Sequence, residues 1–95
     1  MRAEERLASF LLNLSQRLAA RGYLNNEFDL RMSRVEIGSY LGIQIETVSR
    51  MLSRFAESGL IQIKQRHIKL IDMDGLYELA GIPNPERNHC IKKTD

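Results

Sequence analysis

Residues 34–53 read RVEIGSYLGIQIETVSRMLS, which is two short amphipathic segments separated by a glycine. Gly42 stands where the first segment would end, because glycine adopts the left-handed backbone conformation that closes a helix and turns the chain. Gly38 lies inside the first segment, where glycine is less favourable than alanine by about 1 kcal/mol unless another backbone approaches closely. The pattern therefore predicts two helices joined by a tight turn, a helix-turn-helix.

The second segment has one apolar and one polar face. Its apolar residues recur at helical spacing and predict a buried stripe made of Ile45, Val48, Met51, Leu52 and Phe55. Its polar residues Glu46, Ser49 and Arg50 recur on the opposite face. We expect this helix to cover residues 44–58 and to present its polar face outward.

The sequence before the motif predicts a helix and a short strand. Residues 3–21 place leucines on one stripe and indicate an amphipathic helix that Gly22 ends. Residues 27–32 alternate and predict a strand whose inward residues are Phe28, Leu30 and Met32. Ser33 followed by Glu36 forms a capping box, so the first helix of the motif should begin there.

Two period-2 runs follow the motif, LIQIK at 60–64 and HIKLI at 67–71, and they predict a β-hairpin. The residues between them are Gln65 and Arg66, an unfavourable pair for a two-residue turn. We therefore expect a longer or bulged loop at this position.

Residues 74–80 predict a last short helix ended by Gly81. The whole order indicates a winged helix-turn-helix at residues 1–81, which is mainly α with a small β-hairpin (α+β). Residues 82–95 contain two prolines and end in polar residues, so we expect a flexible C-terminal tail.

Composition sets broad limits on the class of protein. A chain of 95 residues that is 43% hydrophobic and 27% charged is typical of one globular domain. The single cysteine, Cys90, and the absence of a signal-peptide pattern favour a reducing, cytoplasmic location. Residues 33–69 contain six basic and three acidic residues, whereas residues 70–95 contain three basic and five acidic. Positive charge is thus concentrated at the motif, as a phosphate partner would require.

The polar face of the second helix is suited to reading base pairs. Glu46, Ser49 and Arg50 lie at i, i+3 and i+4, so their side chains project together. In a major groove, arginine donates two hydrogen bonds to guanine, glutamate accepts one from cytosine, and serine adapts to either role. The alternative is an ordinary surface ion pair between Glu46 and Arg50, worth about 0.2–0.5 kcal/mol.

Phosphate contacts are expected at the helix starts, where backbone N–H groups are free. Ser33 and Arg34 open the first helix of the motif, and Gln44 and Thr47 lie at the start of the second. Ser33 and Gln44 can instead serve as simple caps, and the two roles are compatible.

Three further cations are candidates for phosphate contacts. Arg54 follows Arg50 by one helical turn, and its alternative role is a solvated surface charge. Lys64 and Arg66 lie at the tip of the hairpin, where charge also serves to prevent edge-to-edge pairing of strands. We expect this hairpin to contact the phosphates that flank the bases.

Other chemistry is not indicated. His67, His89 and Cys90 lack the spacing of a metal site. The sequence contains no glycine-rich phosphate loop, nucleophile elbow or spaced carboxylate pair. We therefore expect no catalytic residues, no metal ligands and no cofactor in this chain.

The run Ile37-Gly38-x-Tyr-Leu-Gly42-x-x-x-Glu46-Thr47-Val48-Ser49-Arg50, followed by Arg54-Phe55 and Ser58-Gly59-Leu60-Ile61, resembles a known domain. It is similar to the C-terminal DNA-binding domain of the Crp/Fnr superfamily of bacterial transcription regulators. The resemblance covers about residues 3–81. Glu46-x-x-Ser49-Arg50 looks like the base-reading triplet of the Fnr branch, the oxygen-responsive anaerobic regulators. In the cyclic-AMP branch, an arginine occupies the position of Ile45 and a glycine that of Ser49.

The resemblance implies a two-fold dimer on a palindromic DNA site with half-sites like TTGAT. Glu46 and Arg50 would read the C and G of its G·A core, and Ser49 a neighbouring thymine. It also implies that residues 22–29 touch the α subunit of RNA polymerase during activation, although an ordinary surface connection is an equal alternative. The hairpin also departs from the family, because Gln65 occupies a turn position where relatives often have glycine.

The resemblance also implies that this chain is a domain fragment. Members of the superfamily carry a sensor barrel and a long dimerisation helix before this domain. The Fnr branch holds an iron–sulfur cluster on N-terminal cysteines, which the single cysteine here cannot replace. A full-length parent would therefore supply the cluster or another sensor ligand.

Two functions from different classes follow from these observations. The first is a sequence-specific DNA-binding domain of a bacterial transcription regulator, with the helix at residues 44–58 in the major groove. The second is a winged-helix protein-interaction module that does not touch DNA and uses the same polar face as a protein interface. Binding that depends on both salt and sequence would distinguish the first from the second.

Overall fold

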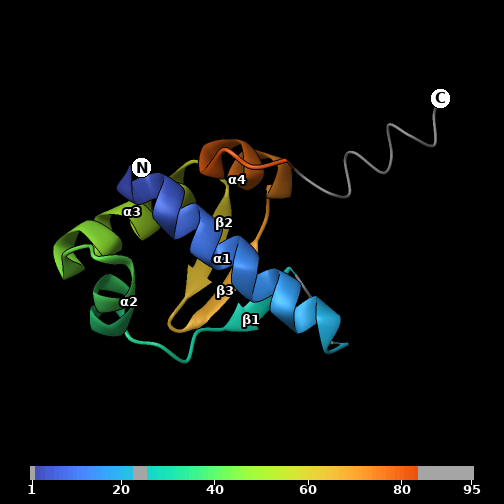
Figure 1. Ribbon diagram of the computed structural model, residues 1–95, viewed down its shortest axis with the longest axis horizontal. Helices are drawn as coiled ribbons and strands as arrows, with labels where there is room; N and C mark the ends of the chain where they lie inside the picture. Colours follow the sequence, from blue (N-terminus) through green and yellow to red (C-terminus); the bar gives the residue numbers. More distant parts are fainter. Residues whose placement is uncertain (1, 23–25, 84–95) are drawn as a thin grey trace.

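The computed structural model describes residues 2–22 and 26–83. The predicted tail at 82–95 therefore lies outside the described residues except for its first two, and so do His89 and Cys90. Within the described part, the helices and strands follow the predicted order (Figure 1). They are α1 (Ala3–Ala20), β1 (Glu27–Asp29), α2 (Arg34–Leu41), α3 (Ile45–Glu57), β2 (Ile61–Lys64), β3 (His67–Leu70) and α4 (Met73–Ala80). None of the described helices combines the length and apolar composition needed to cross a membrane.

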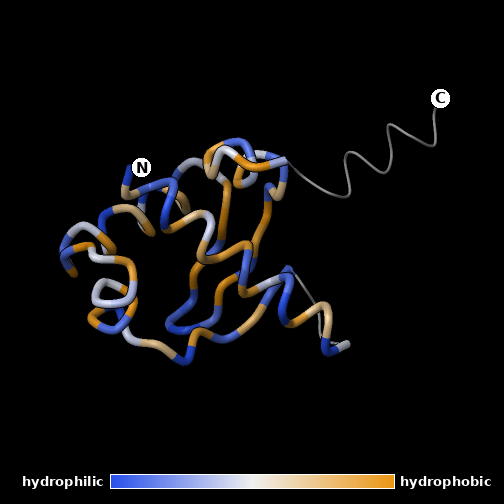
Figure 2. The backbone as a smooth tube through the Cα atoms, viewed as in Figure 1, coloured by the Kyte–Doolittle hydropathy of each residue, from blue (hydrophilic) through white to orange (hydrophobic). Residues whose placement is uncertain are grey.

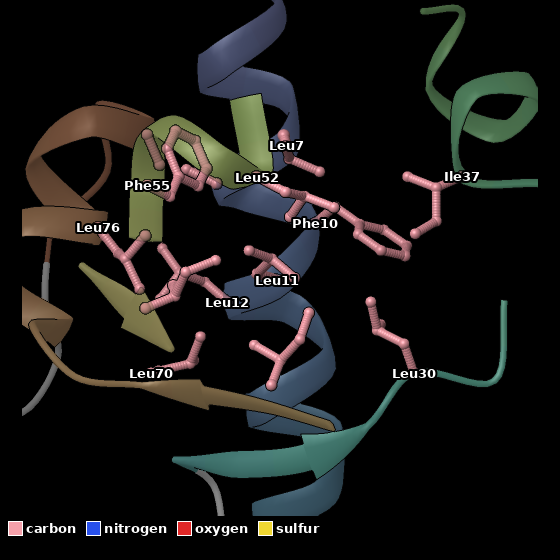
Figure 3. Close-up of a cluster of buried hydrophobic side chains, with 14 of the residues drawn as sticks. Leu7, Phe10, Leu11, Leu12, Leu30, Ile37, Leu52, Phe55, Leu70 and Leu76 are labelled. Carbon is pink, nitrogen blue, oxygen red and sulfur yellow. The ribbon is translucent and has the colours of Figure 1, made fainter. Parts of the chain in front are cut away.

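Helix α1 is the centre of the packing. It crosses in front of the three strands in Figure 1 and contacts both α4 and α3. Its side chains Leu7, Leu11 and Leu12 are almost fully buried, and they belong to a cluster that includes apolar residues from every other helix and from the sheet (Figure 3). The helix-turn-helix and the hairpin are therefore anchored to one shared core, which holds both in place relative to each other.

The three strands form an antiparallel sheet in the order β1-β3-β2. Lys64 of β2 pairs with His67 of β3, so the hairpin loop is only two residues long. The prediction of a longer or bulged loop is therefore wrong. Gln65 adopts a left-handed conformation with φ of 59°, and the backbone N–H of Leu30 donates to the carbonyl oxygen of Arg66 at 2.7 Å. This hydrogen bond from outside the hairpin helps to hold a turn that its own residues disfavour.

The predicted strand at 27–32 is shorter in the structure and ends at Asp29. Phe28 and Leu30 are buried as predicted, whereas Met32 is only partly buried. The chain leaves the sheet after Asp29 because it must reach Ser33, which caps α2. The alternating pattern thus predicted the inward residues correctly but not the end of the strand.

The turn between α2 and α3 explains both glycines of the motif. Gly42 ends α2 with φ of 73°, as predicted. The carbonyl oxygen of Gly38 accepts a hydrogen bond from the N–H of Ile43 at 2.8 Å. A Cβ atom on Gly38 would overlap the carbonyl oxygen of Ile43, so no other residue fits there without a shift of the turn. A second backbone thus approaches closely at Gly38, which is the condition under which glycine is favoured inside a helix.

Helix α3 buries Val48, Leu52 and Phe55, and Met51 is partly buried. Ile45, predicted to belong to the same stripe, is instead 39% exposed. The reason is its position in the first turn of α3, because burial begins one turn later, at Val48. This correction moves an apolar side chain onto the surface beside Glu46.

Candidate nucleic-acid interface

The predicted polar face of α3 is open to solvent. Glu46 and Arg50 are exposed, and Ser49 is partly exposed, on a helix that is regular from Ile45 to Glu57. None of the three makes a side-chain hydrogen bond or an ion pair with the described part of the chain. The alternative of a Glu46–Arg50 surface ion pair is therefore not formed. A glutamate and an arginine without internal partners keep all their hydrogen-bonding capacity for an external one.

The start of α3 is a second open site. Gln44 is the N-cap residue, but its side chain makes no capping hydrogen bond, so its alternative role as a simple side-chain cap is wrong. The first N–H groups of α3 consequently have no acceptor within the helix. Thr47, partly buried, lies in this first turn. Free N–H groups at a helix start attract anions.

A shallow depression of about 370 Å³ joins the start of α3 to the outer side of α2. Val35 and Ser39 of α2 and Gln44 and Ile45 at the start of α3 line it. Val35 is 57% exposed and Ile45 39%, so the surface beside the reading residues is partly apolar. An apolar surface of this kind complements the C5-methyl group of thymine.

The start of α2 is capped, as predicted. The N–H of Glu36 donates to the hydroxyl of Ser33 at 3.2 Å, and the N–H of Ser33 donates to the Glu36 carboxylate at 3.0 Å. The pKa of Glu36 is lowered, mainly by the hydrogen bond from the backbone N–H of Ser33. The side chain of Ser33 and the positive charge of Arg66 lower this pKa further. The cap leaves the N–H groups of Arg34 and Val35 without an intrahelical acceptor, so capping and anion binding are compatible.

The fold brings the hairpin tip to the start of α2. Arg34, Gln65 and Arg66 line one small cavity of about 30 Å³, closed on its inner side by Ile37 and Leu52. Two arginines that are 32 residues apart in the sequence are thereby neighbours beside a helix start. Arginines close to the free N–H groups of a helix start favour phosphate binding.

The hairpin carries the remaining cations. Its tip is strongly hydrophilic (Figure 2), and Lys64, Arg66 and Arg31 line an open depression of about 540 Å³. Arg31 was not predicted as a site residue. It comes beside the hairpin because β1 pairs with β3, a long-range pairing that no local pattern indicates. Arg54 is exposed on α3, and it too makes no ion pair with the described residues.

His67 links the hairpin to β1 through two carboxylates. Its Nδ1 atom lies 2.9 Å from the Asp29 carboxylate and its Nε2 atom 3.4 Å from that of Glu27. The two carboxylates face opposite ring nitrogens, so they cannot share one ion with the imidazole. Across the described ranges, no three side chains of metal-binding type gather into a site.

The sequence is also similar to a known domain family and to known regulatory proteins. The family model of the Crp-like helix-turn-helix domain matches residues 5–79. The transcriptional regulatory protein btr of Bordetella pertussis is 64% identical over 81 residues, which are 85% of this chain and 34% of that protein. The transcriptional activator protein FnrA of Stutzerimonas stutzeri is 51% identical over 79 residues, or 83% of this chain and 32% of that protein.

Among solved structures, FixK2 from Bradyrhizobium japonicum superposes with a TM-score of 0.76 and 37% identity. The match covers 87% of this chain and 40% of that one. The present chain therefore spans about a third of the length of the curated relatives it matches.

Proposed function

Because the chain belongs to the Crp-like helix-turn-helix domain family, in its Fnr branch, we propose that it is the sequence-specific DNA-binding domain of a bacterial transcription regulator. The observation that carries the proposal is the open polar face of α3. Its glutamate and arginine project from a regular helix, have no side-chain partner among the described residues and lie on the same domain as cations of α2 and the hairpin.

In this proposal α3 lies in the major groove, which admits one α-helix. Arg50 donates two hydrogen bonds to a guanine, and Glu46 accepts from the amino group of a cytosine. Ser49 contacts a neighbouring thymine, and exposed Ile45 covers a thymine methyl group. A half-site like TTGAT offers all of these partners.

The phosphate contacts fix the orientation of α3 in the groove. Ser33 and Arg34 act at the start of α2, and Gln44 and Thr47 at the start of α3. The side chains of Arg54, Lys64 and Arg66 add charge on either side. With four of these residues cationic and a slope of about 0.9 per neutralised phosphate, log affinity should fall by roughly 3 to 4 for each tenfold rise in salt.

The proposal extends to a longer parent protein, since the relatives are about three times the matched length. We infer that the parent is a cytoplasmic homodimer and that its two copies of this domain bind the two halves of a palindromic DNA site. Residues 22–29 would contact the α subunit of RNA polymerase during activation. A sensor ligand, such as an iron–sulfur cluster, would belong to the part of the parent outside this chain.

Fluorescence anisotropy tests the proposal directly. The 95-residue chain is titrated into a labelled duplex with a TTGAT palindrome and into a scrambled duplex, each at two salt concentrations. We expect salt-dependent binding with a clear preference for the palindrome. Absence of both would contradict the proposal and favour a protein-interaction module.

The variant Arg50→Ala separates base reading from charge. It should weaken binding to the cognate half-site by about 1–3 kcal/mol and remove the preference for its guanine. Arg21→Ala, which removes an exposed arginine at the end of α1, is the matched control. An equal loss of affinity for cognate and scrambled DNA would indicate that Arg50 contacts phosphate and not a base.

A further inference from the structure

A second surface of the domain, which shares no residue with α3, has the properties of a docking site. A groove of about 350 Å³ lies between α1 and α2. Its floor is apolar and is formed by Phe10 and Leu14 of α1, Met32 of the connecting segment and Leu41 of α2. Neither Glu46 nor Arg50 lines it.

An aromatic pair forms the wall of this α1–α2 groove. Tyr40 is 66% exposed, more than any other large apolar side chain in the described part of the chain. Its ring is tilted against that of Phe10, with centroids 5.7 Å apart. Phe10 in turn reaches from α1 toward Ile37 of α2 (Figure 3), so the exposed tyrosine stands on a rigid base. Exposed aromatic rings on rigid supports are characteristic binding anchors.

The charges along the groove have one sign. Among the described residues that line it, only Arg6 and Arg17 of α1 are charged, and the others are neutral. Arg6 donates to the carbonyl oxygen of Leu41 at 3.1 Å, which places its guanidinium at one end. Arg17 is exposed and makes no ion pair with the described residues. An occupant must therefore be apolar along its centre and acidic toward its ends.

The length of the groove matches a short helix. Arg6 and Arg17 are eleven residues apart on α1, which corresponds to about 16 Å and three helical turns. The helices of a second copy do not fit this description, because α1, α2 and α3 carry arginines and α4 is packed against α1 of its own chain. Amphipathic helices bind apolar grooves through residues spaced at i, i+3, i+4 and i+7.

We propose that the groove between α1 and α2 docks an acidic amphipathic helix of a partner protein while α3 remains free to bind DNA. The proposal does not depend on the function inferred for α3. It assigns the domain a second, simultaneous interaction, whose affinity comes from Tyr40 and the apolar floor and whose orientation comes from the two arginines.

A synthetic peptide tests the proposal. The probe is an 18-residue helical peptide with a leucine stripe and two glutamates eleven residues apart. Titration into the ¹⁵N-labelled 95-residue chain should shift amide signals along α1 and α2 and leave those of α3 unchanged. A peptide of the same composition with the stripe scrambled should bind at least about tenfold more weakly. Equal binding of the two peptides, or shifts spread over the whole surface, would overturn the proposal.

Charge reversal supplies the second readout. Arg17→Glu should weaken peptide binding by roughly tenfold, whereas the matched control Arg21→Glu, outside the groove, should not. Lysine in place of the one peptide glutamate that faces Arg17 should restore binding to Arg17→Glu, because the other glutamate still faces Arg6. Unchanged peptide affinity in Arg17→Glu would overturn the proposal, as would self-association of the chain through Tyr40.

The same samples also test which protein supplies the helix and whether the two functions are separate. A peptide that binds the 95-residue chain but fails to bind a longer natural protein that contains it would assign the groove to segments of the longer protein itself. That result would overturn the proposal of a separate partner protein. Anisotropy with DNA, measured on Arg17→Glu, should match the unaltered chain. Loss of peptide binding should thus leave DNA binding intact, and loss of DNA binding should leave peptide binding intact.

Discussion

Replacing Gly38 with alanine tests the link between the sequence motif and the geometry of the turn. Alanine is the better helix former by about 1 kcal/mol, so helix propensity alone predicts a gain in stability. In the structure, however, the added methyl group would overlap the carbonyl oxygen of Ile43, a backbone atom that cannot rotate away. Overpacking of this kind typically costs about 1–3 kcal/mol.

The turn must also move to make room, and this movement weakens a hydrogen bond. The N–H of Ile43 donates to the carbonyl oxygen of Gly38 itself at 2.8 Å, and its loss costs about 0.5–1.5 kcal/mol. After subtraction of the gain in propensity, we expect a net loss of roughly 1–3 kcal/mol. For a domain of this size, each kcal/mol lowers the melting temperature by about 4–8 °C.

Urea denaturation followed by circular dichroism measures this loss as a lower midpoint at an unchanged slope. Ser39→Ala is the control, since Ser39 is the exposed neighbour in the same helix and should change stability by less than about 0.5 kcal/mol. A shifted turn also displaces α3 relative to α2, so DNA affinity should fall at a temperature where the variant is folded. A Gly38→Ala domain as stable as the original would refute the close approach of the two backbones.

Three further outcomes follow from the structure. The folded-state pKa of Glu36 is lowered, so the charged side chain stabilises the domain fully above the ordinary carboxyl pKa and loses this effect as pH falls through the folded pKa. The difference in unfolding free energy between the unaltered chain and Glu36→Gln should therefore shrink on acidification. A difference that grows as pH falls would contradict this sign. Leu52→Ala should lower the free energy of unfolding by about 2–5 kcal/mol in urea titrations, because Leu52 is 2% exposed, whereas exposed Ser53→Ala should not. Ile45→Ala should leave stability nearly unchanged, since this side chain is 39% exposed. The same variant should discriminate less well between half-sites that contain thymine and half-sites that contain uracil. Equal affinity of the unaltered chain for both half-sites would exclude a contact with the thymine methyl group.

Much of the fold was predictable because local signals coincide at its boundaries. The capping box of Ser33 and Glu36 starts α2, and Gly42 ends it with the left-handed backbone that glycine favours. The apolar stripe of α3 predicted its buried residues from Val48 to Phe55. These signals act within one or two helical turns, so they can be read from the order of the residues alone.

The errors fall where distant segments meet. The length of β1 and the two-residue hairpin loop both depend on which parts of the chain lie against each other, whereas Ile45 is exposed because it precedes the first buried turn of α3. The hydrogen bond from Leu30 to Arg66 illustrates this, because it joins residues 36 positions apart and supports a turn that local preferences disfavour. A period-2 pattern indicates which side chains face inward, but the partner strand decides where pairing ends.

The sequence by itself determined the helix-turn-helix and the three side chains that α3 presents, since helical spacing alone places Glu46, Ser49 and Arg50 on one face. Only the tertiary structure decided that Arg34 and Arg66 lie together beside a helix start, and that a groove with two arginines runs between α1 and α2. The physical reason is the range of the interactions. Backbone conformation and helical periodicity act between neighbours in the chain, whereas burial against a shared core acts between segments that the sequence keeps far apart.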